Sequence, residues 1–276
     1  VDISQANIGA NSTLTLEADR TAGIWKFGDN GGSGSEWTVS GNSMILSGAD
    51  PTIEVLTRTI LSSVIAGSSG IRINGPNKVL FGNGTANTFT GGLTLDGVTV
   101  GENGGGKTVT TAGLNNNQIT VESNSRMTFN GGFTSTSGIT LNNGSVFTVG
   151  VNNSSIFFQG AVTGDGGLQL VKEGDGRNGT HLESTGNTFT GGVQFNASRK
   201  AELIVNSFAD SGSLGAGNLR FTAARNAYEH LFIMDTGFNA ALTLNNRQFD
   251  IADNGADASN EAVGILNRSA QDLTIN

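Results

Sequence analysis

Short runs that alternate apolar and polar residues recur along the chain and predict β-strands. Leu14-Thr15-Leu16 and Trp37-Thr38-Val39 are two early examples. A period of two is what a strand with one buried face requires. The runs are separated by Gly, Asn and Ser, which tolerate the left-handed backbone of tight corners. No segment keeps an apolar i, i+3, i+4, i+7 stripe for three turns, so the pattern predicts an all-β protein.

The strands expected from this alternation are short and closely spaced. A polar stretch rich in Gly and Asn, residues 101–118, is predicted to be a loop or a set of corners. Further strands are expected at residues 25–27, 44–46, 53–56, 60–65, 71–73 and 79–81.

One hexapeptide, Asn-Thr-Phe-Thr-Gly-Gly, occurs at residues 87–92 and again at 187–192. An alternating apolar run follows each copy, so the unit is interpreted as strand, corner, strand. Weaker echoes relate 119–122 to 14–17, 139–142 to 37–40, 162–170 to 65–73 and 223–227 to 18–22. We therefore expect a single solenoid over 1–276, with internal repeats of ~100 residues at approximately 14–118, 119–218 and a truncated 219–276.

A parallel β-helix, or β-solenoid, explains this pattern better than a sandwich or barrel. The repeat is longer than a hairpin and is not built on Asn-Gly hairpin turns. The corners are rich in Asn, Gly and Ser, and the expected inward positions are small, β-branched or Phe, which suits stacks in a narrow core. Coils of roughly 20 to 25 residues are expected.

Composition narrows the classes of partner. The 276 residues include 42 Gly but only 2 Pro, which favours ordered corners over disorder. A net charge of -8 disfavours nucleic acid and anionic membranes as partners. Cys is absent, which rules out disulfides and thiolate metal sites. No apolar run approaches 18 residues, so no membrane insertion is predicted.

The second half of the chain carries a resemblance to a known family. Residues 162–176 read VTGDGGLQLVKEGDG, and GNTFTGG at 186–192 and SLGAGNL at 213–219 follow. This order resembles the autotransporter-associated β-strand repeat, also called the passenger-associated transport repeat. The first copy keeps NTFTGG but has Asn-Gly-Pro-Asn-Lys at 74–78 where the second has Lys-Glu-Gly-Asp-Gly. The resemblance covers roughly residues 60–100 and 160–220.

The resemblance implies a right-handed parallel β-helix, exported by bacteria and found outside the cell or on the cell surface. It implies no catalysis and no cofactor. We expect a structural stalk or fibre subunit that mediates assembly or adhesion, with a glycan-binding adhesin or a β-helical polysaccharide-degrading enzyme as alternatives. Because the repeat stays open at both termini, the expected partners are further copies joined end to end or neighbouring repeats of a longer chain; surface glycans are a further candidate.

Candidate metal ligands are few. The Gly/Asp segments 164–167 and 174–176 are similar to calcium loops, in which carboxylates supply oxygen ligands. The nonapeptide period of calcium β-rolls is missing, which favours a structural role. The two histidines, His181 and His230, lack further ligands at regular spacing, so packing or surface roles are favoured.

Candidate catalytic residues are equally weak. Glycoside cleavage needs two carboxylates at a set separation, and Asp253 with Asp257, or Glu17 with Asp19, could be proposed. Neither pair lies in a recognisable polysaccharide-hydrolase motif. The Gly-Lys-Thr at 106–108 lacks the first Gly of a phosphate-binding loop at the required spacing.

Four aromatic residues have two interpretations. Trp25, Trp37, Phe89 and Phe189 could form a platform on which a sugar ring stacks. They alternate with polar residues, which favours a place in the core. The sequence therefore predicts no catalytic, cofactor-binding or metal-binding residue.

Overall fold

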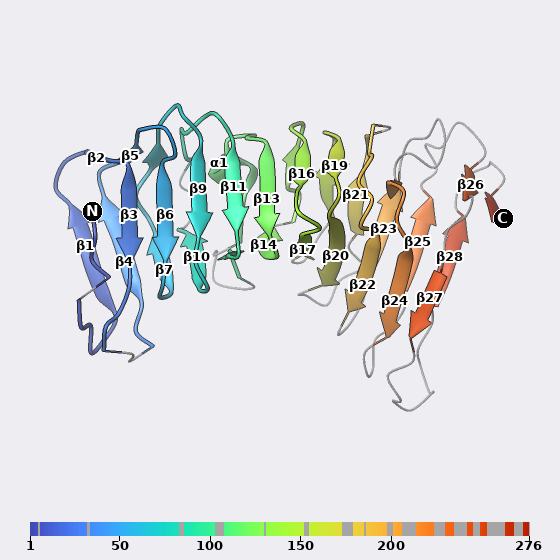
Figure 1. The fold of residues 1–276 in the computed structure, drawn as a ribbon, viewed down its shortest axis with the longest axis horizontal. Coiled ribbons are helices and arrows are strands. Elements are labelled where there is room, and N and C mark those ends of the chain that lie inside the picture. The colour runs from blue at the N-terminus through green and yellow to red at the C-terminus, as the bar shows by residue number, and fades with distance from the viewer. Residues whose placement is uncertain are drawn as a thin grey trace. The chain divides into compact units, whose positions relative to one another are not determined.

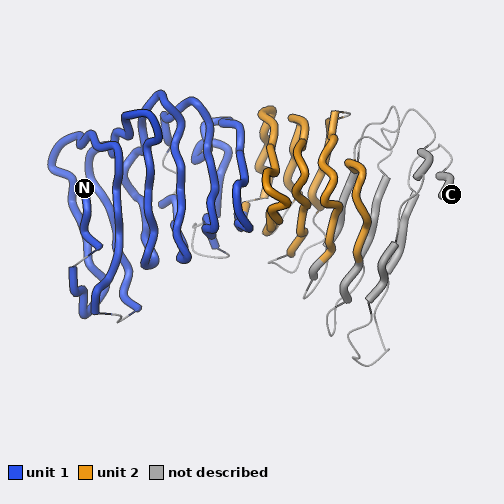
Figure 2. The backbone as a smooth tube through the Cα atoms, viewed as in Figure 1, with its two compact units in different colours: residues 1–128 blue, residues 129–276 orange. Residues whose placement is uncertain are grey.

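The computed structural model divides the chain into two compact units, residues 1–128 and 129–276 (Figure 2). Within each unit, short strands lie side by side (Figure 1). The structure describes the chain except for residues 5, 32–33, 83–85, 103–107, 130, 152–154, 173–178, 185, 198–200, 206–213, 224–229, 235–241, 245–248, 253–262, 268–272 and 276.

In the first unit the strands form three parallel sheets. One sheet contains β1 (Ser12–Leu16), β4 (Trp37–Gly41), β7 (Thr59–Leu61), β10 (Lys78–Phe81), β12 (Thr99–Val100) and β14 (Ser125–Phe129). A second contains β3 (Ile24–Phe27), β6 (Thr52–Val55), β9 (Ile71–Asn74), β11 (Leu93–Asp96) and β13 (Ile119–Ser123). The third contains β2 (Arg20–Ala22), β5 (Met44–Leu46) and β8 (Ile65–Ala66).

The second unit repeats this arrangement. One group of paired strands is β17 (Val146–Val151), β20 (Gly167–Lys172), β22 (Val193–Ala197), β24 (Leu219–Ala223) and β27 (Phe249–Ala252). Another is β15 (Thr134–Ser135), β18 (Ile156–Phe158), β21 (Gly179–Leu182), β23 (Ala201–Val205), β25 (His230–Met234) and β28 (Val263–Asn267). The remaining strands pair as β16 (Ile139–Leu141) with β19 (Val162–Gly164), and β26 (Leu242–Leu244) with β29 (Leu273–Ile275).

Successive strands run along different sides of a coil, and each pairs with the strand of the next coil. Thr59 pairs with Val79, 20 positions on, and Leu219 pairs with Phe249, 30 positions on. Every such pairing among the described strands is parallel, and the fold is a right-handed parallel β-helix, as the sequence predicts. His230 pairs with Val263, 33 positions on, so some coils are longer than the roughly 25 residues expected from the sequence.

Inward side chains stack in columns from coil to coil. In the first unit one column aligns Trp25, Ile53, Ile73, Leu95 and Val121, each no more than 1% exposed. Stacked burial of this kind supplies the main favourable term, at about 25 cal/mol per Å² of apolar surface. The columns hold the strands in register because a one-residue slip would turn every apolar side chain outward.

Phenylalanines fill the interior of the second unit. The ring of Phe129 lies 4.5 Å from that of Phe133, 6.5 Å from that of Phe147 and 5.5 Å from that of Phe158, measured between centroids. Its contacts with Phe147 and Phe158 are edge-to-face, the geometry that aromatic quadrupoles favour.

Two predictions about elements need correction. Residues 60–65, predicted as one strand, belong to β7 and β8 on two sides of a coil. The backbone N–H groups of Ser62 and Ser63 both bond to the carbonyl of Val39, at 2.7 and 3.2 Å, and make the bend. The segment 101–118, predicted as loop or corners, includes a one-turn helix, α1 (Thr111–Leu114). A single turn is too short to show helical periodicity.

Within the described part of the chain, no helix has the length and hydropathy to cross a membrane.

The repeat of ~100 residues is not confirmed as a structural unit. Residues 14–16 lie in β1, whereas their proposed equivalents, 119–121, lie in β13. These two strands belong to different sheets of the same unit. A shorter stretch around the hexapeptide does recur in structure.

Candidate functional site

Both copies of Asn-Thr-Phe-Thr-Gly-Gly take the place of one strand of a coil. In the first unit the motif lies along β8, and the N–H groups of Thr88 and Thr90 donate to backbone carbonyls of that coil at 2.9 Å each. In the second unit the motif lies along β19, and Thr188 and Thr190 make the corresponding bonds at 2.8 and 3.1 Å. The motif therefore continues the hydrogen bonding between coils through a corner.

The asparagine that opens the motif connects neighbouring coils through its side chain. Asn87 accepts a hydrogen bond from the N–H of Ile65 at 2.9 Å and donates one to the carbonyl of Gly113 at 2.8 Å. Asn187 accepts from the N–H of Val162 at 2.7 Å. Both side chains are buried. Asn87 thus bonds to the coil before it and the coil after it.

The phenylalanine of the motif points into the core. Phe89 and Phe189 are both fully buried, as the sequence predicts. In the next coil each lies beneath a corner that begins with a buried leucine, Leu114 or Leu214. The carbonyl of Phe89 accepts from the side chain of Asn117 at 2.8 Å, and that of Phe189 from the N–H of Ala216 at 2.8 Å.

The described corners around the two hexapeptides, residues 87–96 with 114–117 and residues 187–196 with 214–217, share one local pattern of hydrogen bonds and are called the first and the second module. The strands that follow the two hexapeptides, β11 and β22, belong to different sheets, so the likeness is local. Leu114 and Leu214 stand at the same distance after the two hexapeptides. This equal spacing is visible in the sequence, but a search for the hexapeptide alone does not find it.

The glycine pair that ends the motif allows two backbones to touch. A Cβ on Gly91 would lie 2.4 Å from the nitrogen of Gly70, and a Cβ on Gly191 would lie 2.4 Å from the carbonyl carbon of Gly166. Any side chain at these positions forces the coils apart. Gly91 also has a φ of +90°, which favours glycine.

Ion pairs on the surface of the first unit also join different coils. Arg58 pairs with Glu36 and with Glu102, and Arg72 lies 3.4 Å from a carboxylate oxygen of Asp50 and 3.3 Å from one of Asp96. These side chains are partly exposed, so each pair contributes about 0.2–1 kcal/mol.

Among the ionisable groups of the described residues, two have perturbed pKa values. The hydroxyl and backbone N–H of Ser4 donate to Asp2 at 2.6 and 2.9 Å, which lowers the pKa of the Asp2 carboxyl. Burial lowers the pKa of the Arg126 guanidinium. Neither group belongs to a cluster of carboxylates and imidazoles.

The candidate metal ligands that lie in the described residues do not form a cluster. Asp165 accepts a hydrogen bond from the N–H of Gly144 at 3.0 Å, which orders a corner. The segment 174–176 lies outside the described residues. No group of three or more His, Asp or Glu side chains with metal-binding geometry occurs in the described part of the chain. His181 is buried against Phe157, with ring centroids 4.3 Å apart, whereas His230 pairs in register with Ala201.

One candidate acid pair and all four rings of the proposed sugar platform lie in described residues, and the second acid pair does not. Glu17 and Asp19 are exposed, and Asp19 accepts from the N–H of Ser43 at 2.8 Å. Asp253 and Asp257 lie outside the described residues, as does most of the Gly-Lys-Thr segment. The platform alternative is wrong for the four rings proposed, because all four are buried; Trp37, at 9% the most exposed, donates its indole N–H to the carbonyl of Gly28 at 2.9 Å.

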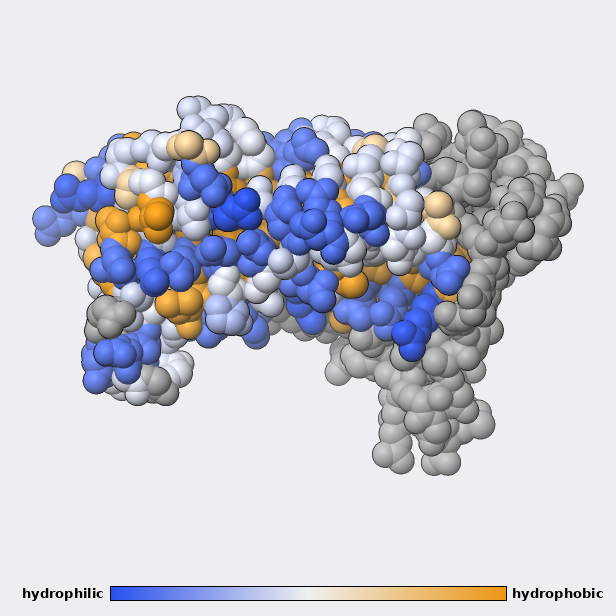
Figure 3. Space-filling model, viewed as in Figure 1, coloured by the Kyte–Doolittle hydropathy of each residue, from blue (hydrophilic) through white to orange (hydrophobic). Residues whose placement is uncertain are grey.

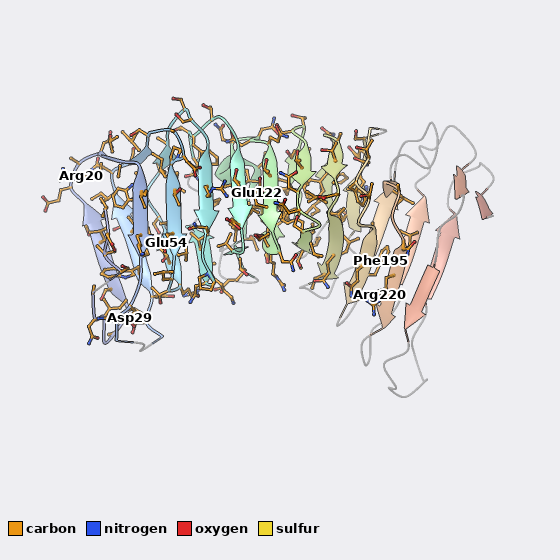
Figure 4. The ribbon with its side chains drawn as sticks, viewed as in Figure 1. Arg20, Asp29, Glu54, Glu122, Phe195 and Arg220 are labelled. Carbon is orange, nitrogen blue, oxygen red and sulfur yellow. The ribbon has the colours of Figure 1, made fainter. Side chains whose placement is uncertain are left out.

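The second unit has a hollow of about 200 Å³ that the sequence does not indicate. It lies on the outer side of β17, β20, β22 and β24. Its lining residues are Val146, Gly167, Leu168, Gly191, Val193, Gln194, Asn218 and Arg220. Figure 4 labels Arg220 on β24, together with Phe195, the buried residue that follows Gln194 on β22.

Comparison with known proteins assigns no family to the chain. It matches no protein-family model, and neither the curated proteins nor the solved structures compared with it include one of significant similarity.

Proposed function

We propose that this protein is a structural β-helical stalk or fibre subunit that acts outside the cell or on the bacterial cell surface, mediates assembly or adhesion, and has no catalytic activity. The observation that carries the proposal is that hydrogen bonds join successive coils through their corners as well as their strands. In both units the hexapeptide adds such bonds where the chain turns.

The physical argument concerns how each coil is held. Parallel strands bond each coil to its neighbours at a spacing of about 4.8 Å. The corners add side-chain bonds such as those of Asn87, and the arginine pairs add bonds that reach across coils. A force on one coil is therefore shared by its strands, its corners and its apolar columns, which suits a protein that must stay extended and rigid.

The outer surface fits a water-exposed stalk. Only 14% of residues are charged, and Thr, Ser and Asn supply most of the polar positions. Figure 3 shows hydrophilic side chains across the described part of one face, with apolar patches between them. The location outside the cell rests on the resemblance of residues 160–220 to the autotransporter-associated repeat.

The location can be tested with antibodies raised against the purified chain. Intact cells of the source bacterium and permeabilised cells would be labelled in parallel, with a cytoplasmic protein as the control for leakage. Labelling of intact cells is expected. Labelling that appears only after permeabilisation would overturn the proposed location.

Assembly can be tested by electron microscopy of the native material. Continuous fibres with an axial repeat near one chain length are expected for a fibre subunit. Isolated rods on a cell-anchored stem are expected for a stalk. Compact particles without an extended form would contradict both.

A glycan-binding adhesin is the second candidate function. The hollow on β17, β20, β22 and β24 favours it, because it joins a concave floor to a row of polar side chains.

A further inference from the structure

We propose that the hollow on the outer face of β17, β20, β22 and β24 binds a neutral glycan that runs along the stack of coils. The hollow accommodates one sugar ring, and neighbouring rings would lie over adjacent coils. This glycan site would supply the binding surface and the ligand class for adhesion, and the inference rests on the adhesive role within the proposed function.

Glycines make the hollow. Gly167 follows Val146 in register, and Gly192 and Asn218 continue the same row on the next two coils. Two adjacent positions of this row therefore carry no side chain. Gly167 and Gly191 line the hollow, and a Cβ on them would lie 2.8 Å from the carbonyl oxygen of Gly191 and 2.4 Å from the carbonyl carbon of Gly166, so the close approach of two backbones requires glycine at the floor. The depression is built into the fold.

Polar side chains border this floor in an adjacent row. Thr148, Gln169, Gln194 and Arg220 follow one another in register on four successive coils. Their neighbours along the strands, Phe147, Leu168, Val193 and Leu219, are buried, so the row faces outward. The hydroxyl of Thr148 donates to Gln169 at 3.0 Å, which orders the first two members.

The spacing of this row suits an extended glycan. Successive coils lie about 4.8 Å apart, close to the advance of one ring along an extended polysaccharide. A chain that follows the axis therefore meets one polar side chain per sugar: a hydroxyl, two amides and the guanidinium of Arg220. Val146, a partly exposed apolar residue of the lining, offers the C–H face of a ring an apolar contact.

The chemistry of the row selects a neutral ligand. A carboxamide both donates and accepts hydrogen bonds, as a sugar hydroxyl does, so Gln169, Gln194 and Asn218 match hydroxyl groups in either role. Arg220 is the one cationic member of the row, and the three other members are uncharged. The net charge of -8 further disfavours a polyanion.

The first module supplies a matched control. Gly70 and Gly92 occupy the corresponding corner, and the adjacent outward row contains Arg72, Thr94 and Thr120. Here Arg72 is held between Asp50 and Asp96, and a threonine stands where the second module has Gln194. The two modules thus share a backbone but differ in the side chains that would contact a sugar.

Binding can be measured by saturation-transfer NMR on the purified chain with tetrasaccharides of the cello-, laminari-, malto- and chito- series, and with tetragalacturonate as the anionic arm. Transfer to at least one neutral tetrasaccharide is expected, and transfer to tetragalacturonate is not. Absence of saturation transfer to every neutral tetrasaccharide, or transfer to tetragalacturonate alone, would overturn the proposal.

Variants then locate the site. Gln194→Trp fills the hollow and should weaken binding at least tenfold, whereas Thr94→Trp, at the same place in the first module, should leave it unchanged. Gln194→Ala removes the amide without adding bulk and should also weaken binding, which keeps the test valid if the tryptophan disturbs folding. Equal binding by Gln194→Ala and the parent chain would refute the site.

This binding experiment uses purified protein, so it is independent of where the chain is found. Binding by a protein that antibodies detect only inside cells would refute the proposed location and leave the glycan site standing. Surface labelling of a protein that binds no neutral glycan would support the proposed location and refute the glycan site.

Discussion

Asn87 shows how much one side chain contributes at a corner. Its amide group is buried and bonds to backbone groups of the coils on both sides. A shorter side chain leaves the N–H of Ile65 and the carbonyl of Gly113 without these partners inside the protein. A buried group that loses its hydrogen bond costs about 1–3 kcal/mol.

We therefore expect Asn87→Ala to lower the free energy of unfolding by about 2–4 kcal/mol. Denaturant melts followed by circular dichroism measure this change. Asn42→Ala is the control, because Asn42 is exposed and its side chain bonds to one carbonyl, that of Leu16, which also accepts the backbone N–H of Asn42 and so keeps a partner. A loss for Asn87→Ala no larger than that of the control would show that water replaces the corner bonds.

Phe189 tests the packing of the same motif. Because the ring is fully buried, Phe189→Ala should lower the free energy of unfolding by about 3–5 kcal/mol. Phe157→Ala is a useful comparison, since Phe157 is only partly buried and should cost less. A loss below about 1 kcal/mol for Phe189→Ala would place the ring on the surface.

At the scale of elements, the corners restrict the sequence more tightly than the strands do. A strand accepts many β-branched or aromatic residues on its inner face, but Gly91 and Gly191 accept nothing larger because another backbone lies against them. The Gly-Gly of the motif is therefore explained by contact between coils as well as by turn geometry.

Two glycines with positive φ distinguish the cost of backbone strain from the cost of a clash between coils. Gly97 has a φ of +70° and open space where a Cβ would lie, so Gly97→Ala should cost only the backbone strain of about 1–2 kcal/mol. Gly91→Ala adds a clash with Gly70 and should cost about 1–3 kcal/mol more. Thermal melts of the two variants give the difference. Equal losses would mean that the coils separate without cost.

The alternation of residues was enough to predict an all-β solenoid, because inward columns such as the one through Ile53 and Ile73 require it. It was not enough to place strand ends, since the bend at Ser62 and Ser63 interrupts an apolar run without a Gly or Asn. The helix α1 escaped prediction because one turn has no period to detect. The hollow escaped because its floor and its polar row come from four different coils, and only strand register brings them together.

At the scale of the whole molecule, charge decides how copies meet in solution. At pH 7 the net charge of -8 makes copies repel one another. Lowering the pH toward the isoelectric point of about 4.7 protonates carboxylates and removes that repulsion.

We expect self-association to increase as the pH falls from 7 to about 4.7 and to be suppressed again at lower pH, where the net charge becomes positive. Light scattering at constant protein concentration and ionic strength measures it. Association that is strongest at pH 7 would show that specific contacts, and not net charge, control assembly.

The pairing of each coil with its immediate neighbours alone has an evolutionary consequence. Duplication of one whole coil, such as residues 93–118, which ends just before Ile119, the register partner of Leu93, would add a coil without changing the cross-section or any existing contact except the one at the point of insertion. Reach and cross-section can thus be selected independently. A lineage that needs a longer appendage can copy a segment, while each copy remains free to acquire its own outward side chains, as Thr94 and Gln194 already show at one shared position.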